Sequence, residues 1–334
     1  MTELRAGIIG YGSAGRGIHG RLLRDVGAQV VRVVTRNPAR ATAAAKDWPG
    51  VQVDATAEDL LAHADQLDVV VIASPTGDHV AHVTAALAAG AHVVVDKPLA
   101  TTAEDAARLA ELGAGRLTVF QNRRWDPEQL TLLGLLAEGK LGRVHRFERR
   151  WERWRPVPQD RWKENDPEAG GLLLDLGAHL VDSAIQLFGP VDSVTAELRN
   201  LTTPAVDDVF LALRHHSGTI SHLQAGSLVG APGPRTRVLG DRGAFLVTSF
   251  EGESSPFSVL DEDGSPFEGR LVRGDEVVPV RRAPGGHPDF YRAVAAWALN
   301  GGPVPVDPAD AVLTARVLDA ARESAAEQRA VRLD

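Results

Sequence analysis

Short apolar runs alternate with helical patterns along the first third of the chain. The runs are rich in valine and isoleucine and lack strict polar–apolar alternation, as is typical of strands buried on both faces. Helix caps are expected between them, at Asn37 before Pro38 and at Thr101 with Glu104. Such repeated strand–helix alternation predicts an α/β domain with a parallel, doubly wound sheet. The expected strands are residues 4–9, 29–34, 51–53, 69–73, 92–95 and 117–121.

The pattern changes near residue 122, where longer runs with more alternation begin. Ser217-Gly218 separates two of these runs and is a good hairpin turn, which indicates an antiparallel sheet. Residues 252–275 are expected to form loops and short hairpins. We therefore expect two domains, residues 1–122 and residues 123–334, the second being α+β with a large, mostly antiparallel open sheet. Its expected elements are strands 146–154, 191–199, 209–216 and 219–228 and helices over 288–299 and from Pro308 onward.

Composition narrows the classes of function. The chain has 334 residues, enough for two domains, and is 44% hydrophobic and 24% charged, which is ordinary for a soluble protein. A net charge of −8 argues against nucleic-acid binding, and the lack of cysteine excludes thiolate catalysis and cysteine-ligated metals. No run approaches the ~20 apolar residues that span a membrane, and no export signal is evident, so a cytoplasmic protein without membrane contact is expected.

A glycine-rich loop, Gly-Tyr-Gly-Ser-Ala-Gly at residues 10–15, follows the first expected strand and precedes a helix. In that context the glycines allow a tight turn, a close approach to a pyrophosphate and close helix–strand packing. The N-terminus of the helix can hold the diphosphate. We therefore expect a dinucleotide cofactor here, although glycine-rich turns without a ligand are also common.

The end of the second expected strand bears on the choice of dinucleotide. Sites that prefer NAD usually place Asp or Glu here, about 20 residues after the loop. This chain has Thr35, Arg36 and Asn37, with Arg40 one helical turn further on. A carboxylate would repel a 2′-phosphate, whereas Arg36 can pair with it. NADP is therefore expected in preference to NAD; the alternative is a solvated arginine beside a helix cap.

Asp96-Lys97-Pro98 follows the fifth expected strand, at the edge where open α/β sheets build their sites. Lys97 is therefore a candidate catalytic residue beside a nicotinamide. A surface lysine in a strand-exit turn is the alternative.

A second candidate cluster lies in and after residues 170–182. Asp175, His179, Asp182 and Gln186 are spaced to form one polar stripe on a helix. An aspartate one turn before a histidine can orient the ring and make it a general base near neutrality. The alternative is a solvent-facing stripe. A metal site is not expected, because no third ligand is evident nearby in the sequence.

Four tryptophans, Trp125, Trp151, Trp154 and Trp162, occur in one arginine-rich stretch. They suit stacking on a sugar ring or a nicotinamide, and they suit core packing equally well.

Five segments together resemble the glucose–fructose oxidoreductase / inositol dehydrogenase / rhizopine catabolism (Gfo/Idh/MocA) family. They are GIIGYGSAGRGIH at 7–19, ASPTGDH at 73–79, VVVDKPLA at 93–100, QNRRWD at 121–126 and GGLLLDLGAHLVD at 170–182. The family usually has Glu-Lys-Pro where this chain has Asp96 before Lys97. The stretch from Gln121 through Trp162 is most similar to the NADP-using scyllo-inositol dehydrogenases of the family.

The resemblance implies an N-terminal Rossmann domain and a C-terminal substrate domain whose open sheet forms homodimers or homotetramers. It implies that His179 takes the hydroxyl proton of a polyol or sugar while hydride leaves the same carbon, with Lys97 and Asp175 assisting. The implied substrate-binding residues are Lys97, Arg123, Trp125, Trp162, Asp175 and His179. The implied cofactor-binding residues are Gly10, Tyr11, Gly12, Ser13, Ala14, Gly15, Thr35, Arg36, Arg40, Ser74, Pro75, Thr76, His79, Asp96, Lys97, Asn122, Arg161 and Trp162.

Three other functions remain open. The substrate class could be different, as in an aldose 1-dehydrogenase or a keto-sugar reductase. A non-catalytic NADP or sugar sensor is possible on the same fold, but it would have no chemical need for Lys97, Asp175 and His179 together. A glycosidase with tightly held NAD would favour an acidic residue at the ribose, which is absent at 35–37.

Overall fold

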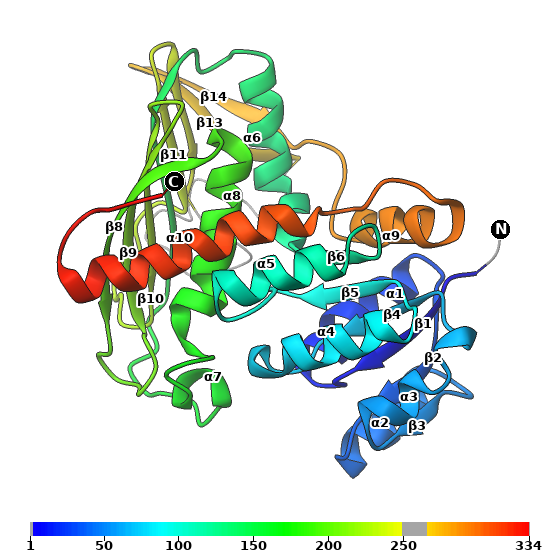
Figure 1. Cartoon of the computed structure of the whole chain (residues 1–334). Helices are drawn as coiled ribbons and strands as arrows, with labels where there is room; N and C mark the ends of the chain where they lie inside the picture. Colours follow the sequence, from blue (N-terminus) through cyan, green and yellow to red (C-terminus); the bar gives the residue numbers. More distant parts are fainter. Residues whose placement is uncertain (1–2, 249–265, 334) are drawn as a thin grey trace. The chain divides into compact units, whose positions relative to one another are not determined.

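The computed structural model describes residues 3–248 and 266–333 and divides into two units (Figure 1). The first consists of Met1–Asn122 with Gly286–Ala315, and the second of Arg123–Gly285 with Arg316–Asp334. The sequence pattern placed residues 286–315 with the second domain, whereas they pack on the first unit. Hydrogen bonds between residues far apart in the sequence hold this segment on the first unit. Trp297 Nε1 donates to the carbonyl of Gly115, and Thr118 Oγ1 donates to the carbonyl of Val306.

The first unit contains a six-stranded parallel sheet, which confirms the predicted doubly wound α/β fold. Its strand order is β3-β2-β1-β4-β5-β6, so the direction of winding reverses between β1 and β4. Val70, Val71, Val93 and Val94 are fully buried, so both faces of the sheet are covered. The strands are β1 (Arg5–Ile9), β2 (Gln29–Val34), β3 (Gln52–Asp54), β4 (Val69–Ile72), β5 (Val93–Asp96) and β6 (Leu117–Phe120).

Helices and single turns connect these strands. Asn37 caps α2 as predicted, because its side chain accepts from the backbone N–H of Arg40. The cap predicted at Thr101 was wrong by one residue: Thr102 accepts from the N–H of Asp105, and this register buries Ala106 and Leu109. The elements are η1 (Gly15–Gly20), α1 (Arg21–Asp25), α2 (Pro38–Asp47), α3 (Ala57–Leu61), η2 (Ala64–Gln66), η3 (Thr76–Asp78), α4 (His79–Ala88), α5 (Ala103–Leu112), η4 (Asn122–Trp125) and α9 (Pro288–Asn300).

The second unit is α+β, also as predicted, and its nine-stranded sheet has the order β14-β13-β12-β11-β7-β10-β9-β8-β15. All neighbouring pairs are antiparallel except β7 with β10. The predicted hairpin at Ser217-Gly218 joins β9 and β10. The strands are β7 (Val144–Glu152), β8 (Val191–Arg199), β9 (Asp208–His215), β10 (Ile220–Gly226), β11 (Thr236–Gly240), β12 (Gly243–Val247), β13 (Phe267–Arg273), β14 (Glu276–Arg281) and β15 (Val331–Arg332).

The strands from β11 to β15 were not predicted individually, because they are short and punctuated by Gly and Pro. Hairpins were expected in residues 252–275, and β13 and β14 do form one. The remainder of that prediction, up to residue 265, lies outside the described residues.

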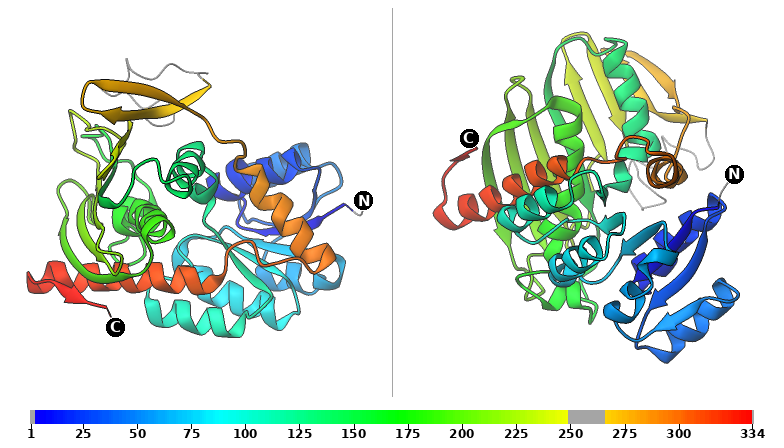
Figure 2. Two further views of the ribbon diagram at one scale, coloured as in Figure 1. Left: turned by 90° about the horizontal axis from the view of Figure 1, so that it is seen from above. Right: turned by 45° about the vertical axis from the view of Figure 1, so that its right-hand side comes forward.

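Helices pack against one face of this sheet, which appears as a single curved layer in Figure 2. Along β9 the core-facing Val209, Leu211 and Leu213 are buried and alternate with partly exposed residues. The helical elements are α6 (Pro127–Ala137), α7 (Trp162–Asn165), η5 (Leu173–Gly177), α8 (Ala178–Phe188) and α10 (Pro308–Glu327), of which α10 begins in the first unit.

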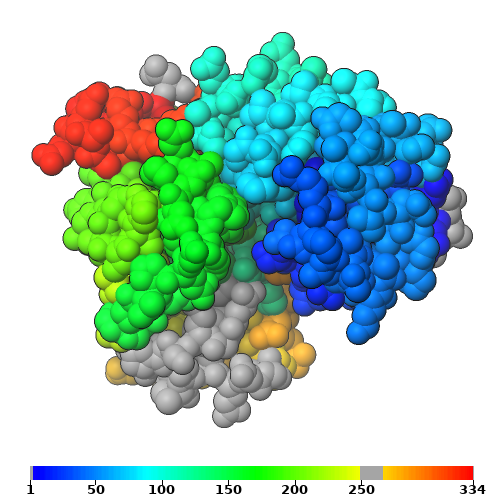
Figure 3. All heavy atoms as spheres, turned by 90° about the horizontal axis from the view of Figure 1, so that it is seen from below, coloured from blue at the N-terminus to red at the C-terminus, as the bar shows by residue number. Residues whose placement is uncertain are grey.

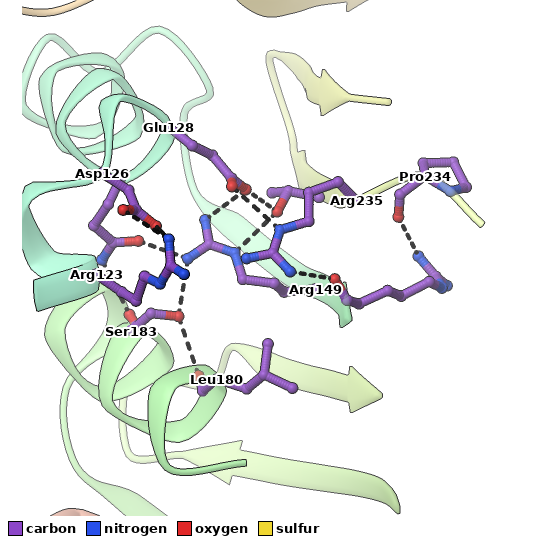
Figure 4. A network of polar contacts seen from close by, with 11 residues as sticks. Arg123, Asp126, Glu128, Arg149, Leu180, Ser183, Pro234 and Arg235 are labelled. Atoms are coloured by element: carbon purple, nitrogen blue, oxygen red, sulfur yellow. Dashed lines mark hydrogen bonds and ion pairs between the residues drawn. The ribbon is translucent and has the colours of Figure 1, made fainter. Parts of the chain in front are cut away.

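A buried ionic cluster ties α6 and α8 to the sheet (Figure 4). The carboxylate of Glu128 on α6 lies 2.9 Å from Arg149 Nη2 and 3.4 Å from Arg235 Nε. Arg149 on β7 also donates to Gln129 Oε1 at 2.7 Å and to Ser183 Oγ on α8 at 2.9 Å. Three charged side chains and two amide or hydroxyl groups thus hold the helix that carries His179.

The ionic cluster should contribute to the acid sensitivity of this unit. Burial alone would raise the pKa of Glu128, but Arg149 and Arg235 outweigh burial and hold the pKa below its usual value. A lowered pKa contributes stability that is present above the unfolded value, about 4.3, and is lost as the pH falls below it.

We expect Glu128→Gln to lower the free energy of unfolding by about 3–5 kcal/mol at pH 7, because it leaves buried guanidinium groups uncompensated. Urea unfolding followed by tryptophan fluorescence measures this. The loss should shrink as the pH falls below about 4.3, because the Glu128 carboxyl of the unfolded wild-type chain then takes up a proton while the folded chain keeps it ionised to lower pH. The control is Glu323→Gln, which breaks an exposed pair with Arg329 and should cost under about 1 kcal/mol. Equal effects of the two substitutions would contradict a stabilising role for the cluster.

Candidate functional site

The glycine loop lies between β1 and η1, at the carboxyl edge of the first sheet where the winding reverses. Gly10 has φ +94°, and a Cβ there would lie 2.7 Å from the carbonyl oxygen of Ala73. A Cβ on Gly15 would collide with the carbonyl oxygen of Gly10. A Cβ on Gly12 would meet only the guanidinium of Arg40, at 3.6 Å. Protein packing therefore requires Gly10 and Gly15, whereas Gly12 leaves space beside Arg40 for a ligand.

The side chain of Tyr11 points into the core of the first unit. Its hydroxyl donates to Asp47 Oδ2 and accepts from Trp48 Nε1, both at 3.1 Å. Burial and then the charge of Asp47 raise the pKa of Tyr11 to about 12, so the hydroxyl stays protonated. Tyr11 thus anchors the loop to the end of α2 through its side chain, which leaves its backbone for a cofactor.

The residues after β2 form an exposed cationic corner. Thr35 is half-buried, and Arg36 and Arg40 are exposed. Within the described residues, no ion pair involves the guanidinium of Arg36 or Arg40, and residues 35–40 contain no carboxylate. Nearby Arg16 differs, because it is already paired with Asp47 at 2.6 Å. Arg36 and Arg40 can therefore receive an anionic group such as a phosphate.

His79 joins the loops that follow β4 and β5. Its Nδ1 lies 2.9 Å from the carbonyl oxygen of Pro98, and its Nε2 lies 3.1 Å from that of Ser74. The ring is 1% exposed, and burial lowers the pKa of His79. Asp96 and Lys97 are half-buried in the second of these loops. Of the other cofactor candidates at this edge, Pro75 is exposed, Thr76 is buried, and Asn122 is buried at the start of η4, just after β6.

Asp175 and His179 lie in the second unit on consecutive helical elements, η5 and α8. Asp175 belongs to a π-helical turn, a geometry that often occurs at functional sites. His179 is 8% exposed, and its ring stacks on Trp151 with centroids 5.9 Å apart and planes at 28°. The alternative of a solvent-facing stripe is therefore wrong for His179.

The residues of the predicted polar stripe each contact a different partner. Asp175 Oδ1 lies 2.5 Å from Lys163 Nζ, a lysine that the sequence analysis did not single out. Asp182 accepts two hydrogen bonds from Arg124, at 2.6 and 2.9 Å. Gln186 accepts from Gln129 at 2.6 Å. Asp182 and Gln186 thus bond to neighbouring elements of the second unit, whereas Asp175 also lines the pocket described below.

Trp151 lies among arginines. The guanidinium groups of Arg123, Arg153 and Arg235 lie 4.8, 5.2 and 4.7 Å from its ring centroid. Trp151 was predicted only as one of four tryptophans in an arginine-rich stretch, and its place beside His179 comes from the pairing of β7 with β10 and from α8.

The remaining aromatic candidates are more open. Trp125 is half-buried, and Trp162 is 39% exposed at the start of α7 with Lys163 Nζ 5.8 Å from its ring centroid. Arg161 precedes this helix and pairs with Glu164, whose carboxylate is the main cause that raises the pKa of Arg161. In Figure 3 the green atoms of the segment around α7 lie on the surface of the second unit.

A pocket beside Asp175 opens within the second unit. It combines cationic, acidic and hydroxyl side chains with a few apolar ones, which suits a small polar ligand. The lining residues are Arg153, Arg155, Val157, Pro158, Gln159, Arg161, Lys163, Glu164, Gly171, Leu172, Asp175, Thr202, Thr203, Val206, Asp207 and Ser227.

Two further features concern the described residues alone. Among residues 3–248 and 266–333, no three His, Asp or Glu side chains form a cluster that could hold a metal ion. In the same residues, no helix is both long enough and apolar enough to cross a membrane.

Two family models match the chain. The model described as "Oxidoreductase family, NAD-binding Rossmann fold" matches residues 4–122. The model described as "Oxidoreductase family, C-terminal alpha/beta domain" matches residues 134–333. Both belong to the Gfo/Idh/MocA family, so the resemblance inferred from the motifs is confirmed.

Individual relatives extend over nearly the whole chain. Scyllo-inositol 2-dehydrogenase (NADP(+)) IolW of Bacillus subtilis (strain 168) is 31% identical over 100% of this chain and 97% of its own length. The uncharacterized oxidoreductase YdgJ of Escherichia coli (strain K12) is 36% identical over 97% of this chain and 96% of its own. The solved structure of yvaA from Bacillus subtilis has a TM-score of 0.88 at 29% identity, covering 99% of this chain and 98% of that one.

Because the two models together cover most of the chain, and the relatives match it from end to end, the chain belongs to the Gfo/Idh/MocA oxidoreductase family and is an enzyme of the NAD(P)-dependent dehydrogenase or reductase type.

Proposed function

We propose that the protein uses NADP(H) to interconvert a secondary alcohol and a ketone, or a lactone, on a small polyol or sugar. The observation that carries the proposal is the setting of His179 and Asp175. The buried imidazole of His179 stacks on Trp151. One turn earlier, the carboxylate of Asp175 pairs with Lys163 and lines a pocket of polar side chains. The name of the relative IolW supports scyllo-inositol as the first substrate to try.

In this proposal the imidazole of His179 accepts the proton of the substrate hydroxyl during oxidation. Bound NADP⁺ would supply the hydride acceptor. The ammonium group of Lys97 stabilises the negative charge that develops on the substrate oxygen. Asp175, held by Lys163, orients a substrate hydroxyl or the ring of His179. In the reverse direction His179 returns the proton to the same oxygen.

The first unit supplies the cofactor contacts of the proposal. Backbone groups of residues 10–15 would hold the diphosphate, since Gly12 leaves its side open. Arg36 and Arg40 would pair with the 2′-phosphate and so favour NADP. The proposed cytoplasmic location and homo-oligomeric assembly through the open sheet follow from the family resemblance.

The direct test is turnover. The purified full chain is mixed with NADP⁺ or NAD⁺ and a panel of inositols and aldoses, and the reduced nicotinamide is followed by absorbance. The proposal expects reduction of NADP⁺ with at least one cyclic polyol or aldose. Cofactor binding without turnover on any member of the panel, in either direction, would contradict the proposed substrate class.

His179→Ala and Lys97→Ala should each lower kcat by about 10²–10⁴-fold, because each removes a group that handles the proton or the developing charge. The Kd for NADP⁺ of His179→Ala should stay within about threefold of wild type. The control is His215→Gln, which alters another buried histidine of the second unit, bonded to Gly189 and Ser221. A kcat for His179→Ala equal to that of this control would refute the assigned role.

Arg36→Ala should weaken NADP⁺ binding by about 10–100-fold and leave NAD⁺ binding nearly unchanged. A hydrogen bond to a charged group contributes about 1.5–3 kcal/mol, and only NADP carries the 2′-phosphate. Calorimetric titration with both dinucleotides measures the difference, and Arg108→Ala, which alters an exposed arginine on α5, serves as control. A parallel loss for both dinucleotides would show that Arg36 does not contact the 2′-phosphate.

Gly12→Ala and Gly15→Ala should separate binding from stability. The new methyl at position 12 makes an ordinary contact with Arg40, so Tm should change little while the Kd for NADP⁺ rises at least tenfold. The methyl at position 15 meets the carbonyl of Gly10, and such overpacking costs about 1–3 kcal/mol, which lowers Tm. Unchanged NADP⁺ affinity in Gly12→Ala would place the diphosphate elsewhere.

A further inference from the structure

A buried polar chain runs through the first unit and ends at the residue before Lys97. Tyr291 on α9 places its hydroxyl 2.6 Å from Nδ1 of His19 on η1. Nε2 of the same ring lies 4.0 Å from Oδ2 of Asp96, at the end of β5. The other carboxylate oxygen, Oδ1, accepts the backbone N–H of Lys97 at 2.9 Å. Tyr291 and His19 are both fully buried, whereas 20% of the Asp96 side chain is exposed.

The protonation states of the two buried groups follow from their surroundings. Burial raises the pKa of Tyr291 well above its usual value, so the phenol keeps its proton and donates it to His19 Nδ1. Burial lowers the pKa of His19, so the ring is neutral at physiological pH. A neutral ring that accepts at Nδ1 carries its only proton at Nε2, on the side of Asp96. The Tyr291 hydroxyl therefore selects the tautomer of His19.

The N–H at Nε2 is a buried donor without a hydrogen-bond acceptor among the described residues. A buried donor that stays unsatisfied lowers the free energy of unfolding by about 1–3 kcal/mol, so an acceptor within reach of Nε2 is expected. Asp96 Oδ2 is that acceptor, and a movement of roughly 1 Å would bring it to ordinary hydrogen-bond distance. The ring cannot tilt away freely, because it packs on Phe120 with centroids 4.3 Å apart.

Few other ionisable groups face this chain. Asp96 is the charge that most strongly opposes the effect of burial on His19, and His79 acts on His19 in the opposite direction. Asp96 acts in the same way on His79, whose own ring nitrogens face the carbonyls of Ser74 and Pro98. Phe120 and Phe290 supply the remaining aromatic walls.

We propose that Tyr291 and His19 form a neutral donor pair that positions the Asp96 carboxylate and, through it, the backbone of Lys97. His19 and Tyr291 are thus positioning residues for the reaction, which act through Asp96. Because the pair is uncharged, it orients the carboxylate without neutralising the negative charge beside Lys97. The inference rests on the proposed role of Lys97, and it explains why a histidine of the glycine-loop helix is bonded to a residue 272 positions away.

The test combines kinetics with the tautomer of His19. Tyr291→Phe keeps the aromatic ring and removes only the hydroxyl, so kcat should fall at least tenfold, while KM for NADP⁺ stays within about twofold. His19→Gln, which keeps a side-chain N–H, should retain more activity than His19→Leu. Thr118→Val is the matched control, because it removes another buried hydroxyl, which bonds Val306, from the same unit. The control should lower Tm as Tyr291→Phe does and leave kcat unchanged.

Nitrogen-15 NMR of the histidine-labelled, cofactor-free protein supplies the second readout. The His19 signal, assigned by its loss in His19→Gln, should show a neutral ring protonated at Nε2 between pH 6 and 8. Asp96→Asn should shift that N–H signal, and Tyr291→Phe should mix the two tautomers. A ring protonated at Nδ1, or one that titrates in this range, would overturn the proposal whatever the kinetics show.

The kinetic outcomes distinguish a failure of the positioning role from a failure of the proposed function. Unchanged kcat in Tyr291→Phe and His19→Leu, with Lys97→Ala inactive, would refute the positioning role and leave the proposed function standing. Full activity of Lys97→Ala would refute the proposed role of Lys97 and, with it, the use of positioning Lys97 in this reaction.

Discussion

In a parallel sheet every strand ends at the same edge, and this constraint organises the first unit. The loops after β1, β2, β4, β5 and β6 must all begin there, so segments more than a hundred residues apart in the chain share one rim. The winding reverses between β1 and β4, and in open α/β sheets such a reversal is where dinucleotides bind. Gly10 shows how tightly the rim is built, since any side chain there would strike Ala73. At Gly12, by contrast, a Cβ would meet only the guanidinium of Arg40, so this part of the rim has space for a ligand.

In the second unit, polar side chains are buried inside an otherwise apolar layer of helices. A buried carboxylate is tolerated only with paired charges and hydrogen bonds, and Glu128 obtains them from Arg149 and Arg235. Arg149 also donates to Ser183 on α8, and the guanidinium of Arg235 lies over the ring of Trp151. The imidazole of His179 rests on that tryptophan, so its orientation depends on charges well away from it. Both units thus position their candidate residues through buried polar contacts that no short motif contains.

The sequence was informative wherever a signal is local. Short apolar runs rich in valine and isoleucine predicted β1 to β6, the Asn37-Pro38 cap predicted the start of α2, and Ser217-Gly218 predicted a hairpin. Local signals failed where two residues were equally good candidates. Either Thr101 or Thr102 could cap α5, and the burial of Ala106 and Leu109 selects Thr102. They could not reveal partners set by tertiary structure. Lys163 precedes Asp175 by 12 residues across an irregular segment, and Tyr291 reaches His19 only because α9 packs on the first unit. The roles of Lys97, Asp175 and His179 remain predictions.

The proposed preference of the first unit for NADP over NAD is tested by calorimetric titration of the full chain with NADP⁺ and NAD⁺. NADP⁺ is expected to bind at least about tenfold more tightly than NAD⁺, because a hydrogen bond between charged groups at the 2′-phosphate contributes about 1.5–3 kcal/mol. The preference should weaken as salt is added, since the arginines are exposed. Equal affinity, or tighter binding of NAD⁺, would contradict it.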